Sequence, residues 1–396
     1  MLVSRRYFFF GSLALPALAA KKPAPAASKL ARPNLLLILV DGLPSWILGC
    51  YGNQEIRTPS LDRLAQTGTH FLNHMACTAA PALSRATLLT GRTPMQLGDA
   101  ENPPAGAASL DKALGDAGYV THAADLGAAG QFLDQQAAGK PFFLTASHPG
   151  PRPPYDGVEQ KYHDLYAKTQ FDTLDLQRTP AANARLGREM LADTIGNIRK
   201  FAAAVSALDA DVGALLQKLS QRKLLDNTLV VFTSACGALL GRRGLWDAGD
   251  ASDPPNMYEE TVGTPLIWSW SGHVPAQAMR PEVVSTYDLV PSICGVADAD
   301  PPPGNLCGLS YRLLATGKPL PKKQPWRTTV YGHYRTTEMA RGDRYKLVMH
   351  GGATGELYDL RPDPGEKINQ YDNEQFLTVR TTLSQGLSNW KQRYSA

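Results

Sequence analysis

Four continuous apolar runs stand out along the chain. Residues 34–41 are apolar up to a closing acid, Asp41, and similar runs occupy residues 141–147, 228–234 and 265–270. A run without polar alternation is typical of a strand that is buried on both faces of a parallel sheet. The pattern therefore predicts a sheet that helices cover on both sides.

Helical spacing lies between these runs. Residues 60–67, 109–117 and 195–224 carry it, and the longest of the three presents one continuous apolar face. Strands that alternate with helices indicate an α/β fold with a doubly wound, mainly parallel sheet, whose site lies at the carboxyl ends of the strands. We expect Asp41 and Ser234 at such ends, on different strands.

The pattern changes after residue 318. Short strand-like segments broken by Gly and Asp turns follow, and residues 376–394 have the pattern of an amphipathic helix. The short strands are expected at residues 328–334, 345–350 and 356–360. We therefore predict a main α/β domain over residues 33–318 and a small C-terminal α+β subdomain over residues 319–396.

The first residues predict export. Arg5 and Arg6 precede aromatic residues in a twin-arginine pattern, an apolar run follows, and small residues at 17–19 offer a cleavage site. The apolar run is too short to span a bilayer as a stable helix. We expect a twin-arginine-type signal peptide over residues 1–20, a linker over residues 21–32, and a periplasmic or secreted protein with no transmembrane segment after signal removal. An uncleaved membrane anchor is the alternative.

Composition excludes one class of partner. Hydrophobic residues make up 43% of the chain and charged residues 19%, which is ordinary for a globular protein. The net charge of +4 is small, and no basic stripe interleaved with aromatics is present, so we expect no nucleic-acid partner. The 5 cysteines are an odd number, which leaves at least one thiol unpaired in an exported monomer. Cys294 and Cys307 flank a Pro/Gly-rich loop and could pair, and the other three are expected to be buried.

Several stretches of the chain resemble the sulfatases of the alkaline-phosphatase superfamily. The stretches are residues 32–41, 58–65, 84–92, 224–234 with 244–247, and 343–347 with 356–360. The resemblance covers about residues 32–396. It implies a sulfatase-like α/β fold and sulfuric ester hydrolysis as the family reaction.

The resemblance also implies where a nucleophile would stand. Sulfatases use a formylglycine made from a Cys or Ser in a Cys-x-Pro-Ser-Arg motif, at a helix N-terminus where backbone dipoles favour anions. Alignment without gaps on Ser84 and Arg85 places Pro81 at that position, and Ala82 and Leu83 stand between. Proline cannot become formylglycine, so the resemblance predicts the loss of covalent catalysis.

The family's divalent cation, commonly calcium, would also lack its ligands. The resemblance implies two Asp after the first strand and an Asp-Asn or Asp-His pair after a later strand, and these positions hold Asp41, Gly42, Ala235 and Cys236. A hard cation needs several oxygen ligands. We therefore expect no cofactor, and calcium only if the protein is active after all. Asp41 is alternatively a strand-end turn residue or a helix cap.

Most of the family's sulfate-clamping basic residues have no counterpart. Ala248 stands where the family commonly has a Lys, and Arg152 aligns with the expected catalytic His, with His148 close by. Arg85 persists. The resemblance leaves two roles for Arg85, in ligand binding or as a helix N-terminal residue that pairs with Asp41.

The residues leave three interpretations open. The first is an inactive sulfatase homologue kept for a binding or structural role, in which Arg85 and Arg152 weakly hold a sulfated or other anionic small molecule or glycan. The second is an ester hydrolase with a relocated nucleophile, Cys77, Thr78 or Ser84, which needs an activating base or metal. The third, an active sulfatase built on Cys77, is disfavoured because the residues after it lack the motif. We expect the first.

Overall fold

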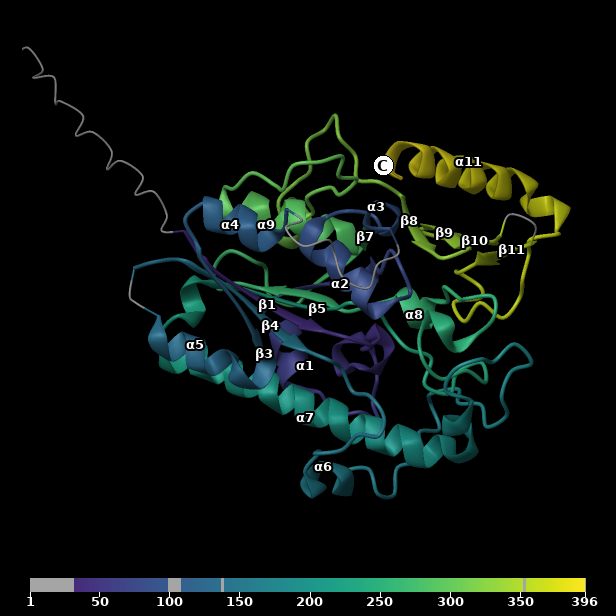
Figure 1. Cartoon of the computed structure of the whole chain (residues 1–396), viewed down its shortest axis with the longest axis horizontal. Coiled ribbons are helices and arrows are strands. Elements are labelled where there is room, and N and C mark those ends of the chain that lie inside the picture. Colours follow the sequence, from purple (N-terminus) through teal and green to yellow (C-terminus); the bar gives the residue numbers. More distant parts are fainter. Residues whose placement is uncertain (1–31, 99–107, 137–138, 352–353, 396) are drawn as a thin grey trace, which may run out of the picture. The chain divides into compact units, whose positions relative to one another are not determined.

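The computed structural model describes residues 32–98, 108–136, 139–351 and 354–395 (Figure 1). The predicted signal peptide, and the predicted linker up to residue 31, lie outside the described residues. Residues Pro33–Ala396 form one compact unit, so the boundary at residue 318 stays a prediction. Within the described ranges, no helix combines the length and apolar character needed to cross a membrane.

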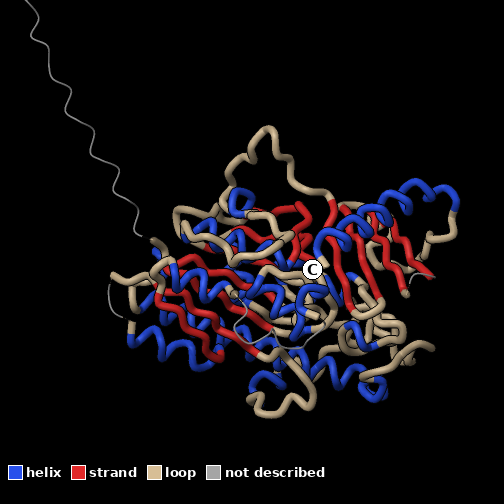
Figure 2. Tube along the Cα trace, turned by 45° about the horizontal axis from the view of Figure 1, so that its top comes forward, coloured by secondary structure: helices blue, strands red, loops and turns tan. Residues whose placement is uncertain are grey.

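A seven-stranded sheet forms the centre of this unit, in the order β3-β4-β1-β5-β6-β2-β7 (Figures 1 and 2). The strands are β1 (Asn34–Val40), β2 (Thr69–Met75), β3 (Val120–Asp125), β4 (Phe142–His148), β5 (Thr228–Ser234), β6 (Leu266–Ser269) and β7 (Ala278–Ser285). Neighbours pair in parallel except at β6, which runs antiparallel to β5 and β2. The predicted doubly wound, mainly parallel sheet is confirmed.

Burial on both faces of the sheet explains why strand β1 is apolar after Asn34. All of its residues are buried, and successive side chains enter two different hydrophobic clusters, one on each face of the sheet. Leu36, Ile38 and Val40 belong to one cluster, and Leu35, Leu37 and Leu39 to the other. A strand that is buried on both sides favours apolar residues, and the one polar residue of β1, Asn34, donates a hydrogen bond to Thr228.

Helices cover both faces of the sheet (Figure 1). Helices α1 (Pro59–Gln66), α5 (Ala129–Gln135) and α7 (Thr194–Gln221) lie on one face, and α6 (Gln160–Asp164) contacts α7. Helices α2 (Pro81–Thr90), α4 (Leu110–Asp116), α9 (Leu289–Ala297) and α10 (Arg312–Ala315) lie on the other face. The short helices α3 (Pro94–Leu97) and α8 (Glu259–Val262) lie in connections, as do 3-10 segments at Ser45–Ile47, Gly49–Tyr51, Leu126–Ala128, Arg188–Asp193, Leu225–Asn227, Gly249–Ala251, Thr286–Asp288 and Glu374–Phe376.

Two features of the large sheet differ from the sequence prediction. Strands β2, β3 and β7 were not predicted, because β3 and β7 are edge strands with exposed positions and β2 contains polar residues. The run at residues 265–270 forms β6, but this strand is antiparallel rather than parallel. The connection from β5 to β6 contains only the four-residue helix α8 and 3-10 segment Gly249–Ala251, with no crossover helix of the length that usually joins parallel strands.

The predicted C-terminal subdomain is a four-stranded antiparallel sheet with one covering helix (Figure 2). Its strands are β8 (Thr329–Tyr334), β9 (Thr337–Gly342), β10 (Tyr345–His350) and β11 (Thr354–Asp359), and α11 (Leu377–Tyr394) packs on them. Leu387 and Trp390 of α11 share a hydrophobic cluster with Leu347. Strand β9 was missed, because its Thr, Glu and Arg residues break the apolar pattern.

The cysteines are free thiols. Cys77, Cys236 and Cys294 are buried, and Cys50 and Cys307 are half-buried. The pairing of Cys294 with Cys307 that the spacing allowed is therefore not formed. Burial of Cys77 and Cys236 agrees with the prediction that these thiols serve as apolar packing.

Candidate functional site

Two strand ends bring the predicted site residues together. Val40, the last residue of β1, pairs in register with Ser234, the last residue of β5. Ala235 then donates its N–H to the carbonyl of Val40 at 2.8 Å. The Ser234 hydroxyl accepts from the N–H of Leu43 at 3.1 Å and donates to the carbonyl of Cys236 at 2.7 Å. The two loops are thus tied together, with Asp41 and Ala235 at one edge of the sheet.

Asp41 is the acceptor of two arginine side chains. Its Oδ2 atom accepts from the guanidinium of Arg85 and from Nη2 of Arg152, the latter at 3.3 Å. The Asp41 side chain is 3% exposed, whereas those of Arg85 and Arg152 are 36% and 55% exposed. Burial raises the pKa of Asp41, and the two guanidinium charges oppose that shift. Asp41 therefore forms ion pairs from the bend that follows β1, as one alternative allowed, and it does not cap a helix, because Pro44 is the N-cap of the next helical segment.

Gly150 fixes how Arg152 reaches Asp41. The backbone of residue 150 is left-handed (φ +84°), and a Cβ there would lie 1.8 Å from the carbonyl oxygen of Asp41. Only glycine fits this approach. The chain after β4 therefore crosses directly over Asp41 and delivers Arg152 two residues later.

His148 stands beside the same carboxylate. Its Nδ1 accepts from the N–H of Gly150 at 3.0 Å, and its carbonyl accepts from the N–H of Asp41 at 3.2 Å. Burial lowers the pKa of His148, although the charges of Asp211, Asp41 and Asp125 act in the opposite direction. At neutral pH the imidazole is therefore uncharged, so the positive charge of this region comes from Arg85 and Arg152.

The residues at the predicted cation positions do not suit calcium. Gly42 and Ala235 offer no side-chain ligand, and Cys236 offers a soft sulfur that is fully buried, with a pKa that burial raises further. The one carboxylate, on Asp41, already accepts from two guanidinium groups. Among the residues that the structure describes, no group of three or more His, Cys, Asp or Glu is arranged to hold a metal ion. Calcium needs six to eight oxygen ligands, so this donor set does not fit it.

The candidate nucleophiles are sealed inside the protein. Pro81 is the first residue of α2, and Cys77, Thr78 and Ser84 are each fully buried. Burial raises the pKa of Cys77 to about 11, against hydrogen bonds with Thr286 and Thr87 that lower it. The reactive species of cysteine is the thiolate, so Cys77 is both protonated and out of reach of a dissolved substrate.

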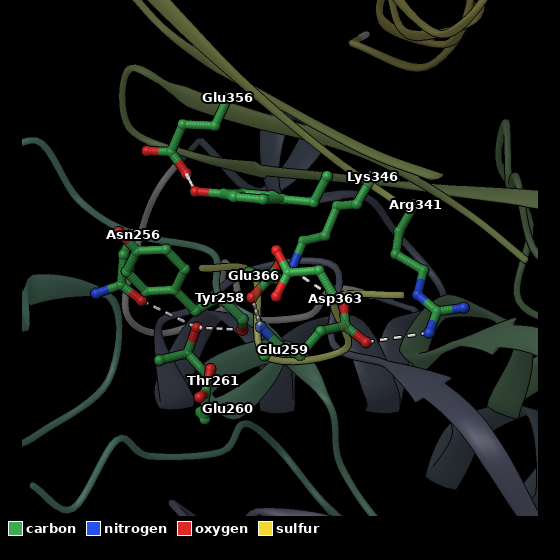
Figure 3. A network of polar contacts seen from close by, with 12 residues as sticks. Asn256, Tyr258, Glu259, Glu260, Thr261, Arg341, Lys346, Glu356, Asp363 and Glu366 are labelled. Atoms are coloured by element: carbon green, nitrogen blue, oxygen red, sulfur yellow. Dashed lines mark hydrogen bonds and ion pairs between the residues drawn. The ribbon is translucent and has the colours of Figure 1, made fainter. Parts of the chain in front are cut away.

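A network of buried charged side chains lies beneath the small sheet (Figure 3). The sequence analysis did not predict this network. The Nζ atom of Lys346 lies 3.0 Å from Glu259 and 2.7 Å from Glu366. The side chains of Lys346 and Glu366 are 0% exposed. The network could have been predicted from Lys346, which lies within the apolar strand β10, because a buried lysine requires a charged or polar partner.

Two family models match the chain. The sulfatase model matches residues 33–130 and 126–299, and the C-terminal model of N-sulphoglucosamine sulphohydrolase matches residues 251–393. The chain belongs to the sulfatase family. Sulfuric ester hydrolysis is the family's reaction.

Curated relatives cover most of the chain. Human arylsulfatase A is 27% identical over 426 residues, which span 85% of this chain and 83% of the relative. An N-acetylglucosamine-6-O-sulfatase from Bacteroides thetaiotaomicron is 23% identical, over 93% of this chain and 88% of its own. Similarity therefore extends through both the main domain and the C-terminal subdomain of the sulfatase-family protein.

Solved structures show the same fold. The complex of BT4656 with its substrate D-glucosamine-2-N,6-O-disulfate superposes with a TM-score of 0.79 at 20% identity, over 92% of this chain and 98% of the other. The phosphonate monoester hydrolase of Agrobacterium radiobacter gives a TM-score of 0.75 at 19% identity, over 92% and 96% of the two chains. At such identities the likeness concerns the fold, and the chemistry rests on this chain's own residues.

Proposed function

We propose that this sulfatase-family protein no longer hydrolyses sulfate esters and instead binds an anionic group at Arg85 and Arg152. The observation that carries the proposal is the sharing of the Asp41 carboxylate by both guanidinium groups. Each guanidinium has five N–H donors, so both can hold Asp41 and still donate to a ligand. The three side chains together carry one net positive charge that can attract an anion, although Asp211 and Asp125, whose charges act on the neighbouring His148, weaken that attraction.

Loss of hydrolysis follows from the same positions. Pro81 stands where the resemblance expects the formylglycine, and Gly42, Ala235 and Cys236 stand where it expects cation ligands. Preorganised electrostatic stabilisation of this kind contributes several kcal/mol to such reactions. Without the nucleophile and the cation ligands, the site has no evident way to stabilise the transition state of ester hydrolysis.

The alternative is a hydrolase that uses Cys77, Thr78 or Ser84. Full burial of the three side chains speaks against it, because a nucleophile must approach its substrate to about 3–3.5 Å. Burial raises the pKa of Cys77, whereas an activated thiol nucleophile needs a lowered one. We therefore place this alternative second.

The proposed ligand is a sulfated or carboxylated small molecule or glycan, bound weakly outside the cytoplasm. Sulfated sugars support this choice, since the neighbour BT4656 was solved with its substrate D-glucosamine-2-N,6-O-disulfate and one relative is an N-acetylglucosamine-6-O-sulfatase. Export by the twin-arginine-type pattern around Arg5 and Arg6 belongs to the same proposal. Weak binding is expected because Asp41 offsets one of the two positive charges.

Binding is tested by thermal-shift titration with inorganic sulfate at constant ionic strength. We expect sulfate to stabilise the native protein and to lose that effect in Arg85→Ala. Arg222→Ala is the matched control, because Arg222 is also a partly exposed arginine but lies 4.0 Å from Asp134, away from Asp41. Superimposable titrations of the native protein and Arg85→Ala would reject the binding role.

Catalysis is tested with chromogenic aryl sulfates and phosphates, with and without calcium. We expect no turnover above background in the native protein, and none in Pro81→Cys, because the modification motif and the cation ligands are also missing. A burst of released chromophore from the native protein would favour the hydrolase alternative. Substitution of Cys77 by serine would then show whether that thiol is responsible.

A further inference from the structure

Asp250 is another carboxylate that lies between two arginines. Oδ1 of Asp250 lies 3.0 Å from Nη1 of Arg335 and 3.9 Å from Nη1 of Arg185, and Oδ2 accepts from the hydroxyl of Tyr334 at 2.7 Å. The Asp250 side chain is 24% exposed, and the side chains of Arg185 and Arg335 are 50% and 47% exposed. The arginines therefore keep donors in solvent while the aspartate orients them.

The segments that carry Arg335 and Arg185 are held close to Asp250. Arg335 lies in the tight turn between β8 and β9 with a left-handed backbone (φ +54°), and its guanidinium stands 5.2 Å from the ring centroid of Tyr334. The N–H of Arg185 donates to the carbonyl of Ala251 at 2.7 Å. The Arg185 backbone is thus tied to the Asp250 segment, and Tyr334, next to Arg335, is tied to Asp250 through its hydroxyl, which restricts where the two arginines lie before a ligand binds.

This arrangement repeats that of the first site. At Asp41 and at Asp250, two guanidinium groups share one carboxylate and leave one net positive charge. Such a group of donors matches the oxygen atoms of a sulfate, carboxylate or phosphate. A lone surface arginine pair would repel itself, and here the aspartate offsets that repulsion.

The residue before Asp250 contacts the segment that leads into helix α2. The N–H of Gly249 donates to the carbonyl of Ala79 at 3.1 Å, and a Cβ at residue 249 would lie 2.7 Å from the Cβ of Ala79. Ala79 lies two residues before the first residue of α2, the helix that carries Arg85. Asp250 therefore follows directly on a residue that touches the segment leading into the first site.

We propose that Arg185, Arg335 and Asp250 form a second anion site, and that the natural ligand carries at least two anionic groups on one chain, as a sulfated oligosaccharide does. The proposal deepens the binding role given above and rests on it. Engagement of one group raises the effective concentration of the next. The oligosaccharide therefore binds more tightly than separate sulfate ions, although neither site binds a single sulfate strongly.

The test compares a heparin-derived hexasaccharide with inorganic sulfate as probes of the native protein. Titration calorimetry at fixed ionic strength measures hexasaccharide affinity, and thermal shift follows sulfate. We expect Arg185→Ala/Arg335→Ala to lose about tenfold in hexasaccharide affinity, as expected when one of two linked sites is removed. The sulfate response that depends on Arg85 should remain in this double variant.

The control is Lys112→Ala/Lys161→Ala, which removes two exposed cations that each pair with a carboxylate elsewhere. An equal loss of affinity in this control means unspecific attraction and overturns the second site. Should the alanine double variant not fold, Arg185→Lys/Arg335→Lys keeps both charges but not the planar donors, and unchanged hexasaccharide affinity in it overturns the proposal.

The two proposals fail in different ways. Hexasaccharide affinity that is insensitive to Arg185 and Arg335 but falls in Arg85→Ala overturns the second site and leaves the first. Affinity that depends on Arg185 and Arg335, with no response of any probe to Arg85→Ala, supports the second site and removes the proposed role of Arg85.

Discussion

Two charge clusters in this molecule have similar chemistry and opposite surroundings. The cluster at Asp41 places a buried carboxylate against two arginines that reach solvent, with Arg152 55% exposed. The network at Lys346 places charges of both signs in the interior, with Lys346 and Glu366 at 0% exposure. The first lies at the carboxyl ends of β1 and β4, where the resemblance places the family's reaction centre, and the second joins the small sheet to the main domain.

The interior network connects separate parts of the chain (Figure 3). Lys346 comes from β10, Glu259 begins α8, and Glu366 lies in the loop after β11. Arg341 of β9 adds a contact to Glu259 at 3.0 Å. Arg243 contacts Glu366 at 3.2 Å and also Glu260, at 3.1 Å. Without Lys346, Glu259 would keep only Arg341 and Glu366 only Arg243, so two buried carboxylates would each lose one of their two cations.

The difference indicates which charged residues the fold depends on. Ion pairs that reach solvent contribute about 0–1 kcal/mol, because water screens them and replaces lost partners. Buried pairs cannot exchange a partner for water, so loss of one member costs about 3–5 kcal/mol. We therefore expect removal of a solvent-reaching arginine beside Asp41 to cost the fold little, and removal of the buried Lys346 cation to cost more.

The largest expected effect is that of Lys346→Met. The change removes the cation between Glu259 and Glu366 and keeps the apolar stem, so the free energy of unfolding should fall by about 3–5 kcal/mol. Urea unfolding at neutral pH measures it. Lys161→Met is the control, because Lys161 makes a contact with Glu159 at 2.9 Å on the surface. Equal losses of unfolding free energy in the two variants would contradict the claim that the buried network stabilises the fold more than a surface ion pair does.

Most of the fold was predictable from the sequence. The buried strands β1, β4 and β5 carry continuous apolar runs, and the long helix α7 carries an apolar face at helical spacing. These patterns are typical of elements that pack in the core of an α/β sheet. The edge strands β3 and β7 were missed, because a strand with one neighbour and exposed positions resembles a loop in composition. The direction of β6 depended on the length of its connection rather than on its own residues.

The candidate site was predictable only in part. The family motifs located Asp41 and Arg85, and register between β1 and β5 brought Asp41 beside Ala235 as expected. The contacts of Arg152 could not be foreseen, since they depend on Gly150 packing against the Asp41 backbone. The roles of Arg85, His148 and Arg152 in binding stay predictions.

A second prediction concerns pH. Burial raises the pKa of Glu366 to about 7, although Lys346 acts to lower it. The native state therefore binds a proton more tightly than the unfolded chain, and this group's contribution to stability falls as pH rises from about 4.5 to about 7. As pH rises through that window, the free energy of unfolding of Glu366→Gln should increase relative to that of the native protein by on the order of 1–3 kcal/mol. Urea unfolding at several pH values measures the difference. A difference that does not change with pH would contradict this role.

Glu259 gives the opposite dependence at lower pH. Burial alone would raise its pKa, but Arg341 and Lys346 lower it to about 2. Its contribution to stability is present above the unfolded pKa and is lost as pH falls from about 4.5 towards 2. The Glu366→Gln comparison is therefore best made above pH 5, where Glu259 remains ionised in both states.

A third prediction sharpens the comparison at the exposed cluster. Asp41→Asn removes the negative charge between Arg85 and Arg152 and raises the local net charge from one to two positive charges. Sulfate affinity should rise several-fold, because one further unit charge at contact distance contributes about 1 kcal/mol in water. Sulfate titration by thermal shift measures the change. Weaker sulfate binding in Asp41→Asn would show that Asp41 mainly positions the arginines.

The smallest expected effect is on stability, in Arg152→Ala. Arg152 contacts Asp41 at 3.3 Å but is more than half exposed, and Arg85 remains to hold the carboxylate. The free energy of unfolding should therefore fall by less than about 1 kcal/mol. Sulfate stabilisation should weaken in the same variant, since one of the two donor groups is lost. Urea unfolding with and without sulfate separates these effects. A loss of several kcal/mol in the absence of sulfate would place Arg152 with Lys346 as a structural residue and end the distinction between the two clusters.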